Sequence, residues 1–326
     1  MDIIHDKDAD VSVLNGKTVA VIGYGAQGRA QALCMRDSGV NVIIGIRPGK
    51  SWDAAVQDGF RVMSVEEAAK EGDIVHLLLP DEKHGEVYKN QIAPAMKAGK
   101  TLCCSHGFAY VFKTIVPPAD VDVIMVAPKG PGTEVRRVFE EGFGCPGLIA
   151  VFQNPSGKAR DVALAIAKAE GLTRGGVLEC TMAQETYEDL FGEQNVLCGG
   201  LVDLMKYGFE TLIEAGYPAE MAYFECVHEA KLIVDLIYNG GIQRMNSVIS
   251  NTAEFGEYYN GPQILGPEVK AKMKESLKRI ESGEFARVWL EEAAKGAPNL
   301  LAMRAALAEP PVEIVGRKIR SRFERN

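Results

Sequence analysis

The chain has 326 residues, of which 47% are hydrophobic and 25% are charged, and its formal net charge is -8. A single hydrophobic core usually stops growing at about 250–300 residues, so two domains are expected. This composition excludes a disordered or fibrous protein, and the acidic balance argues against a nucleic-acid partner, because such proteins usually carry a basic face.

The N-terminal residues and the cysteines indicate the cellular compartment. The chain begins Met-Asp-Ile-Ile-His-Asp-Lys-Asp, which lacks the apolar core of a signal peptide. No apolar run approaches the roughly 20 residues that span a bilayer. The seven cysteines form neither a C-x-x-C pattern nor a disulfide framework. We therefore expect a cytoplasmic protein with reduced thiols and no membrane segment.

Between residue 17 and about residue 151, short β-branched runs alternate with amphipathic stretches. This alternation predicts an α/β domain in which helices cover a parallel sheet. The predicted strands are 18–23, 41–46, 74–79, 101–105, 123–127 and 148–152, with helical segments such as 65–70 and 91–98 between them.

A glycine-rich turn follows the first predicted strand directly and precedes a helical run. It reads Gly23-Tyr24-Gly25-Ala26-Gln27-Gly28, a G-x-G-x-x-G sequence. In a Rossmann fold the first glycine permits the turn, the second lets a pyrophosphate approach, and the third permits close packing. The helix N-terminus then attracts the anion. We expect dinucleotide binding here; the alternative is a purely structural turn.

The loop after the second predicted strand suggests which dinucleotide binds. An acidic residue at this place would bind the ribose hydroxyls of NAD, but the chain has Arg47, followed by Lys50 and Ser51. These side chains can donate to a 2′-phosphate. NADPH is therefore favoured. NADH stays possible, because Asp53 could turn toward the ribose.

From about residue 182 the pattern changes to long helical periodicity. Predicted helices cover about 183–215, 218–239, 242–258, 267–282 and 284–295. We predict a dinucleotide-binding domain over residues 1–181 and an all-α domain over residues 182–326.

Two pairs of acids lie within this helical half. Asp189 and Glu193 form the first pair, Glu225 and Glu229 the second, and each has i, i+4 spacing. This spacing stacks two side chains on one helix face, about 6 Å apart, where like charges repel. Solvated faces are the alternative. The apolar neighbours of both pairs favour metal binding instead, and an all-oxygen ligand set favours Mg²⁺.

Together these segments resemble the ketol-acid reductoisomerases, also called acetohydroxyacid isomeroreductases, in their short, class I form. The resemblance covers nearly the whole chain. It is carried by Val-Ile-Gly-Tyr-Gly-Ala-Gln-Gly (21–28), Ser-His-Gly-Phe-Ala (105–109), Ala-Pro-Lys-Gly-Pro-Gly (127–132), Asp-Leu-Phe-Gly-Glu-Gln (189–194), Glu-Cys-Val-His-Glu (225–229) and Ile-Ser-Asn-Thr-Ala-Glu (249–254).

The resemblance implies a knotted helical domain and an active site that holds two Mg²⁺ ions. It implies that Asp189 bridges the ions and that Glu193 binds one, while Glu225 and Glu229 come from a neighbouring subunit. The chain should then form a homo-oligomer, at least a dimer, with a dodecamer as the larger alternative. Four further residues are expected at the site: His106 and Lys129 beside the reacting atoms, Ser250 at the substrate carboxylate and Gly132 at the cofactor.

The implied substrate is 2-acetolactate or 2-aceto-2-hydroxybutyrate. An alkyl group migrates from C2 to C3, and NADPH then reduces the new ketone to give a 2,3-dihydroxy-3-methyl acid, a step of valine, isoleucine and leucine biosynthesis. Glu229 or a hydroxide on the metal serves as the base; the sequence does not choose between them.

Simpler interpretations remain for single residues and for the whole chain. His106 could cap a turn, Lys129 could be an exposed turn lysine, and Ser250 could be a helix N-cap. The rival functions are a metal-independent β-hydroxyacid or 6-phosphogluconate-type dehydrogenase and a sensor that binds NAD(P)H without turnover.

Overall fold

The computed structural model describes residues 2–323. It forms two compact units, one ending at Glu188 and the other beginning at Asp189. The predicted domain boundary between residues 181 and 182 falls at the start of helix α9, the helix in which the two units meet along the chain. Among residues 2–323, no helix has both the length and the apolar composition needed to span a membrane.

The first unit is built on one sheet, with strand order β3-β2-β1-β4-β5-β6-β7-β8. The chain leaves β1 toward β2 on one side and returns to β4 on the other, as in a doubly wound fold. The strands are β1 (Thr18–Ile22), β2 (Asn41–Gly45), β3 (Arg61–Met63), β4 (Ile74–Leu77), β5 (Thr101–Cys104), β6 (Asp122–Pro128), β7 (Gly147–Gln153) and β8 (Val177–Glu179).

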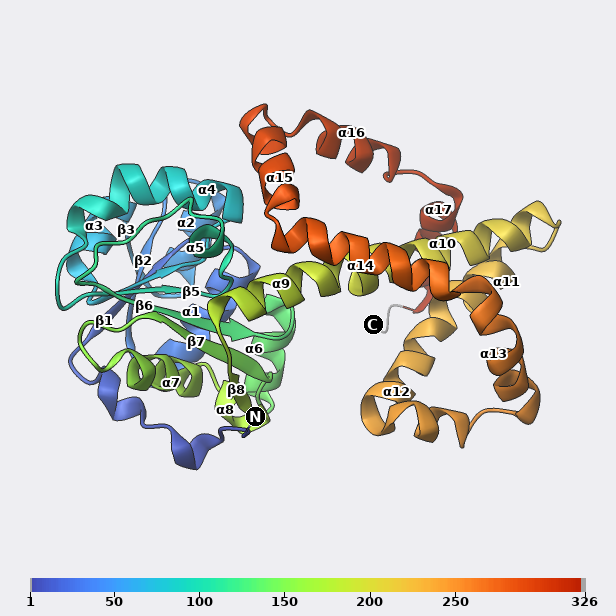
Figure 1. Cartoon of the computed structure of the whole chain (residues 1–326), viewed down its shortest axis with the longest axis horizontal. Coiled ribbons are helices and arrows are strands. Elements are labelled where there is room, and N and C mark those ends of the chain that lie inside the picture. Colours follow the sequence, from blue (N-terminus) through green and yellow to red (C-terminus); the bar gives the residue numbers. More distant parts are fainter. Residues whose placement is uncertain (1, 324–326) are drawn as a thin grey trace. The chain divides into compact units, whose positions relative to one another are not determined.

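Both faces of this sheet are buried, which explains the continuous apolar runs of its strands. Along β1, Val19 and Val21 enter one core, whereas Ala20 and Ile22 enter the core on the opposite face. Helices lie on both sides of the sheet (Figure 1). The helical elements of this unit are η1 (Asp6–Asp8), η2 (Val11–Leu14), α1 (Ala26–Asp37), α2 (Lys50–Gln57), α3 (Val65–Glu71), α4 (Asp81–Val87), η3 (Tyr88–Ile92), η4 (Ala93–Ala95), α5 (Phe108–Val111), α6 (Gly132–Glu140), α7 (Ala159–Ala169) and α8 (Leu172–Gly175).

The sheet departs from the predicted all-parallel arrangement at β7, which runs antiparallel to β6. The reason lies in the connection: Gly147 at the start of β7 pairs with Pro128 at the end of β6, so α6 returns the chain to the edge that it left. A parallel strand would need a crossover to the opposite edge. The short strands β3 and β8 were not predicted from the pattern.

The second unit is helical, as predicted. Two of its elements, η5 and η6, are single π-helical turns, and its elements are α9 (Met182–Gly192, beginning in the first unit), η5 (Glu193–Leu197), α10 (Gly199–Glu214), α11 (Ala219–Tyr223), η6 (Phe224–His228), α12 (Glu229–Asn246), α13 (Asn251–Ile264), α14 (Pro267–Glu281), α15 (Glu284–Ala294), α16 (Pro298–Ala306) and α17 (Pro311–Phe323).

Several helix boundaries differ from the prediction. The helix expected to end at residue 239 continues as α12 to Asn246, with non-helical backbone at Gly241, and α16 and α17 were not predicted. A continuous helix over 242–258 was expected, but α12 extends to Asn246 and α13 starts only at Asn251. The new helix begins at Ser250, whose hydroxyl accepts a hydrogen bond from the backbone N–H of Ala253 and so caps α13.

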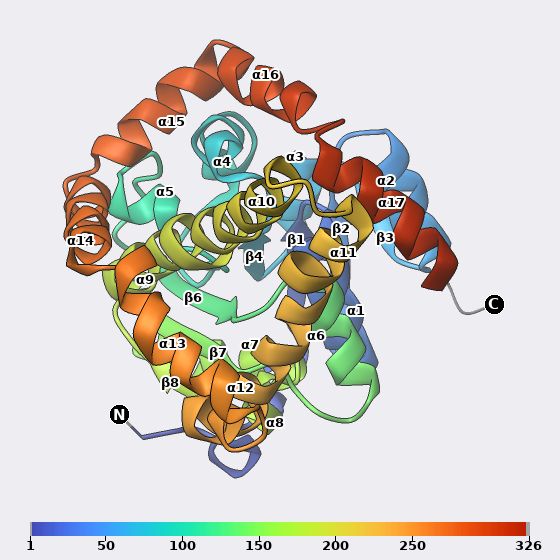
Figure 2. The same ribbon diagram turned by 90° about the vertical axis from the view of Figure 1, so that its right-hand side faces the viewer.

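The second unit buries little of its apolar surface. Its small core gathers Phe209, Ala222, Tyr223 and Ile319 where α10, α11 and α17 lie side by side (Figures 1 and 2). Beyond this core, α14 and α15 contact each other, and Figure 2 shows α14, α15 and α16 following one another along an open arc. Most of the exposed large apolar side chains of the described residues belong to this unit.

Candidate active site

The glycine-rich turn leads directly from β1 into α1. Gly23 has a φ of 107°, a left-handed conformation that side chains disfavour, and its N–H donates to the carbonyl of Gly45 at the end of β2. A Cβ on Gly28 would collide with the carbonyl of Gly23. The first and third glycines are therefore required by the tightness of the turn itself.

Gly25 differs from these two glycines because a Cβ built on it would meet no atom within 4 Å. Gly25 is the N-cap residue of α1. The unpaired backbone N–H groups of the first turn of α1 therefore lie next to open space. This arrangement leaves room for an anionic group at the helix N-terminus.

The other residues of the turn hold it to neighbouring loops. Tyr24 donates to Asp58 (2.7 Å), and burial together with this acceptor raises the pKa of Tyr24. Gln27 donates to the carbonyl of Gly130 (2.9 Å). Gly132 packs so closely on the turn that a Cβ there would collide with the carbonyl of Ala26.

Arg47, Lys50 and Ser51 occupy the loop after β2 and the first turn of α2, and all three are exposed. The last residue of β2, Gly45, pairs with Ile22 of β1, immediately before the glycine-rich turn. Register therefore brings this loop and the turn to the same edge of the sheet.

A buried carboxylate brings the two predicted polar residues of the reaction site together. Glu185 of α9 is 1% exposed; its Oε2 accepts from Nδ1 of His106 (3.1 Å) and its Oε1 from Nζ of Lys129 (2.7 Å). The backbone N–H of Gly107 also donates to Oε2 (3.3 Å). His106 follows β5 and Lys129 follows β6, so Glu185 joins the ends of two adjacent strands.

The charge of Glu185 follows from these contacts. Burial opposes ionisation of the carboxyl, but hydrogen bonds and charge interactions with His106 and Lys129 outweigh it, so the pKa of Glu185 lies below its usual value. Glu185 is therefore an anion at neutral pH. Two donors of different kinds are thereby held at fixed positions.

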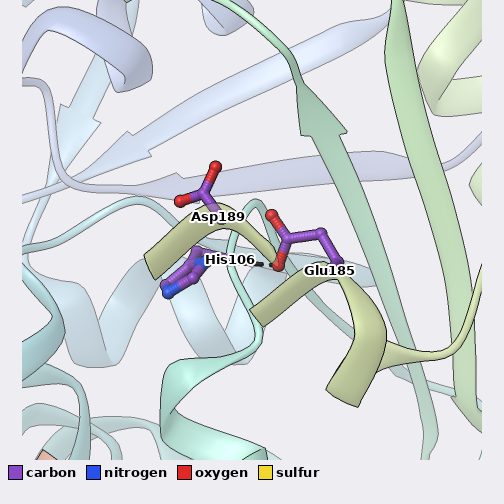
Figure 3. A group of neighbouring side chains, drawn as sticks. All are labelled: His106, Glu185 and Asp189. Carbon is purple, nitrogen blue, oxygen red and sulfur yellow. Dashed lines mark hydrogen bonds and ion pairs between the residues drawn. The ribbon is translucent and has the colours of Figure 1, made fainter. Parts of the chain in front are cut away.

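Asp189 stands one turn beyond Glu185 on α9 and completes a group of three. Ligand atoms of His106, Glu185 and Asp189 all lie within 4.8 Å of one another, and Figure 3 shows Glu185 and Asp189 on their shared helix, with the hydrogen bond from His106. Both oxygens of Glu185 already accept hydrogen bonds, and the Lys129 ammonium contacts one of them. Glu185 therefore holds His106 and Lys129 in place, and the half-buried Asp189 lies beside it on the same helix.

The remaining predicted ligands lie outside this group. Glu193 begins the π turn η5, Glu225 lies in the π turn η6 and Glu229 follows η6; all three are exposed. Single π turns inside α-helices are frequent at functional sites. Ser250 is also exposed and caps α13, so the N-cap interpretation describes its contact in this structure.

Two family models match the chain. One, described as acetohydroxy acid isomeroreductase, NADPH-binding domain, matches residues 13–176, and the other, described as ketol-acid reductoisomerase, C-terminal domain, matches residues 182–325. The chain belongs to the ketol-acid reductoisomerase family.

Relatives and a solved structure agree with this assignment. A protein of Akkermansia muciniphila named ketol-acid reductoisomerase (NADP(+)) is 87% identical over 326 residues, which is 100% of both chains. One from the uncultured archaeon GZfos26G2, named ketol-acid reductoisomerase (NAD(+)), is 63% identical over 99% of both chains. The structure of an NADH-preferring ketol-acid reductoisomerase from an uncultured archean matches with 62% identity over 100% of both chains, and its TM-score is 0.98.

These matches confirm the resemblance to ketol-acid reductoisomerases of the short form and the predicted fold class, a Rossmann-type unit followed by an all-α unit. The knot stays a prediction.

Sequence reasoning missed Glu185, although a signal was present. Glu185 lies three residues after Met182 and four before Asp189. Met182 and Glu185 are both buried, so they lie on the same, buried side of α9. The acidic pair with i, i+4 spacing that the sequence indicated begins at Asp189, one turn after Glu185. In this member of the ketol-acid reductoisomerase family, an acid on the buried side of a helix indicates a candidate site as clearly as the two acidic pairs do.

Proposed function

We propose that the chain catalyses the Mg²⁺-dependent alkyl migration of 2-acetolactate or 2-aceto-2-hydroxybutyrate and the reduction of the product by NADPH to a 2,3-dihydroxy-3-methyl acid. It thereby serves valine, isoleucine and leucine biosynthesis. One observation carries the proposal: a buried, ionised Glu185 holds His106 and Lys129 beside the carboxylate of Asp189.

The chain's own residues have separable tasks. The ammonium of Lys129 donates hydrogen bonds toward the substrate oxygens, and the ring of His106, whose Nδ1–H donates to Glu185, lies beside the reacting atoms. Glu185 fixes both side chains and balances the charge of Lys129. Ser250 lies at the start of α13, where its hydroxyl and the helix N-terminus suit a carboxylate. Glu229 would act as the base; bound metal ions would supply the alternative.

The donor set suits Mg²⁺, which prefers carboxylate oxygens and shares its remaining positions with water and substrate. Asp189 and Glu193 of one subunit, with Glu225 and Glu229 of a second, would hold two ions. When bound, the ions polarise the substrate hydroxyl and ketone as Lewis acids.

A second copy is supported by the apolar surface of the helical unit. Tyr238 is 81%, Phe255 68% and Leu197 66% exposed, all on helical elements of this unit. Soluble monomers rarely leave so many large apolar side chains uncovered. We therefore propose a homo-oligomer, at least a dimer, with a dodecamer as the larger alternative. No nucleic-acid or membrane partner is proposed.

For the cofactor we propose NADPH, with NADH as the alternative. Arg47, Lys50 and Ser51 offer cationic and hydroxyl donors at the edge of the sheet where the glycine-rich turn begins, which favours a 2′-phosphate. Relatives named for NADP(+) and for NAD(+) both exist, so preference varies among proteins similar to this chain.

We propose the cytoplasm as its location. All seven cysteines are free, as expected of a reducing compartment. For the domains, we propose the boundaries 1–181 and 182–326.

A direct assay of NADPH oxidation tests the function. Oxidation of NADPH on addition of 2-acetolactate is followed with Mg²⁺ present and again after chelation. We expect turnover with Mg²⁺ and its loss in chelator. Full activity in chelator would instead identify the metal-independent dehydrogenase. A sensor would show cofactor binding without turnover, and Asp189→Asn would not alter it.

A further inference from the structure

Five groups inside the first unit form a single chain of hydrogen bonds. It begins at His76 in β4, passes through Ser105 after β5 and through Gln31 and Gln27 of α1, and ends on the carbonyl of Gly130 after β6. The successive distances are 3.2 Å from His76 Nε2 to Ser105 Oγ, 3.1 Å to Gln31 Oε1, 3.0 Å from Gln31 Nε2 to Gln27 Oε1 and 2.9 Å from Gln27 Nε2 to Gly130 O. His76 and Gln31 are 0% exposed.

The carbonyl at the end of the chain fixes the direction of every bond. It can only accept, so Gln27 must present its amide N–H to Gly130 and its oxygen to Gln31. Gln31 must then donate with its nitrogen and accept from Ser105 with its oxygen. The single hydroxyl proton of Ser105 is thereby used, which leaves its oxygen to accept from Nε2–H of His76.

The state of His76 agrees with this direction. Complete burial lowers its pKa to about 3, so the ring is neutral at ordinary pH and carries one proton. The direction of the chain places that proton on Nε2. No member can reverse without breaking a bond, because a backbone carbonyl cannot become a donor.

This row of hydrogen bonds joins three segments that carry the candidate site. Gln27 belongs to the glycine-rich turn, Gly130 follows Lys129 directly, and Ser105 directly precedes His106. His76 and Gln31 belong to no predicted site. His76 lies among Ile74, Val75 and Leu77 in a buried strand, where an apolar side chain would avoid the desolvation of an imidazole.

We propose that this row of hydrogen bonds is a positioning network. In it, buried Gln31 and His76 fix the position of the glycine-rich turn relative to the segments that carry His106 and Lys129. The inference rests on the proposed dinucleotide site, because the position of the glycine-rich turn affects function only if a dinucleotide binds there. Gln31 and His76 act through Gln27, Ser105 and Gly130 and touch no substrate.

The test measures NADPH and NADH binding by fluorescence, together with kcat and both KM values, on the full oligomer with Mg²⁺. Gln31→Met keeps the size of the side chain but removes both hydrogen bonds. We expect it to weaken cofactor binding by about tenfold, in the range of a lost buried hydrogen bond, and to leave the KM for 2-acetolactate nearly unchanged.

Met35→Ala is the matched control. Met35 lies one turn further along α1, is 0% exposed and belongs to the apolar core, not to the chain. It should lower the melting temperature without changing cofactor binding. If Gln31→Met and Met35→Ala lost cofactor affinity equally, the effect of Gln31→Met would be explained by packing alone, and the proposal would be overturned.

Ser105 provides a second, independent break at a less buried place. Ser105→Ala should weaken cofactor binding, Ser105→Thr should restore it by returning a hydroxyl, and adding Gln31→Met to Ser105→Ala should cost little more, since the chain is already broken. Additive losses, or no rescue by threonine, would contradict a connected network. If the unaltered protein binds neither cofactor, the proposed dinucleotide site itself fails, which is a separate outcome.

Discussion

Glu185 shows how one residue can organise a site without being its obvious member. Its carboxylate is buried, yet it is ionised because His106 and Lys129 contact it from two strand ends. The glycine-rich turn, Asp189 and the loop with Arg47 could be found in the sequence, because each depends on local spacing. Glu185 could not be assigned a partner in this way, since 79 residues separate it from His106.

Replacing Glu185 by Gln should disable catalysis while the fold persists. The amide keeps the shape but removes the charge that orients Lys129 and His106, so we expect kcat to fall by about 10- to 100-fold, as for partners that orient active-site groups. Steady-state kinetics with Mg²⁺ and NADPH measure this. Glu188→Gln, an exposed acid on the same helix, is the control and should keep normal kcat. An unchanged kcat in Glu185→Gln would remove Glu185 from the site.

His76 should make the first unit sensitive to acid. Its pKa is lowered from 6.5 to about 3 in the folded protein, so between these values the unfolded chain binds a proton that the folded chain does not. Stability from this group is present above pH 6.5 and falls as the pH drops, by about 1.4 kcal/mol per unit. Urea unfolding from pH 7 to 4 measures this slope. His76→Asn should have a shallower slope; an identical slope would show that other groups cause the acid sensitivity.

At the scale of elements, periodicity located most strands and the helical half but not their irregularities. The three-residue strands β3 and β8 are too short for a pattern to reveal, and the antiparallel direction of β7 depends on where α6 returns the chain. Likewise, i, i+4 spacing suggested ordinary helical turns at both acidic pairs, whereas the structure has the π turns η5 and η6 there. A π turn changes which side chains share a face, and that change leaves no mark in the residue spacing.

The loop between β2 and α2 should determine cofactor preference. Replacing Arg47 by Asp removes a cation and adds an anion where we place the 2′-phosphate, so the KM for NADPH should rise more than the KM for NADH, by about tenfold or more. Parallel titrations of both cofactors provide the measurement. Equal increases in the two KM values would show that Arg47 does not contact the phosphate.

At the scale of the whole molecule, the prediction includes acids from a second subunit, which the structure of a single chain does not contain. Asp189 joins a group with His106 and Glu185, whereas Glu225 and Glu229 are exposed on η6 and α12, in a unit with a small core and a large apolar surface. Neither the periodicity of the helices nor the spacing of the acids states which copy completes which site. That part of the prediction came from the family resemblance alone.

Mixed oligomers should show that each site draws on two copies. Asp189→Asn and Glu229→Gln should each be inactive alone. When the two variants are co-expressed, every mixed pair contains one site with both acids intact, so about a quarter of normal activity should return if subunits pair at random. If each chain formed its own complete site, mixing would restore nothing.

We propose that acids of this family member converge to hold two hard cations beside the cofactor. Mn²⁺ is a suitable probe, because it accepts the same oxygen ligands as Mg²⁺ and its free form is counted by electron paramagnetic resonance. Titration of the intact oligomer with NADPH present should show two Mn²⁺ ions per chain, as the family resemblance implies, and Asp189→Asn should weaken both because that carboxylate would bridge them. Two ions whose binding is unchanged in Asp189→Asn, or no stoichiometric binding at all, would contradict the account.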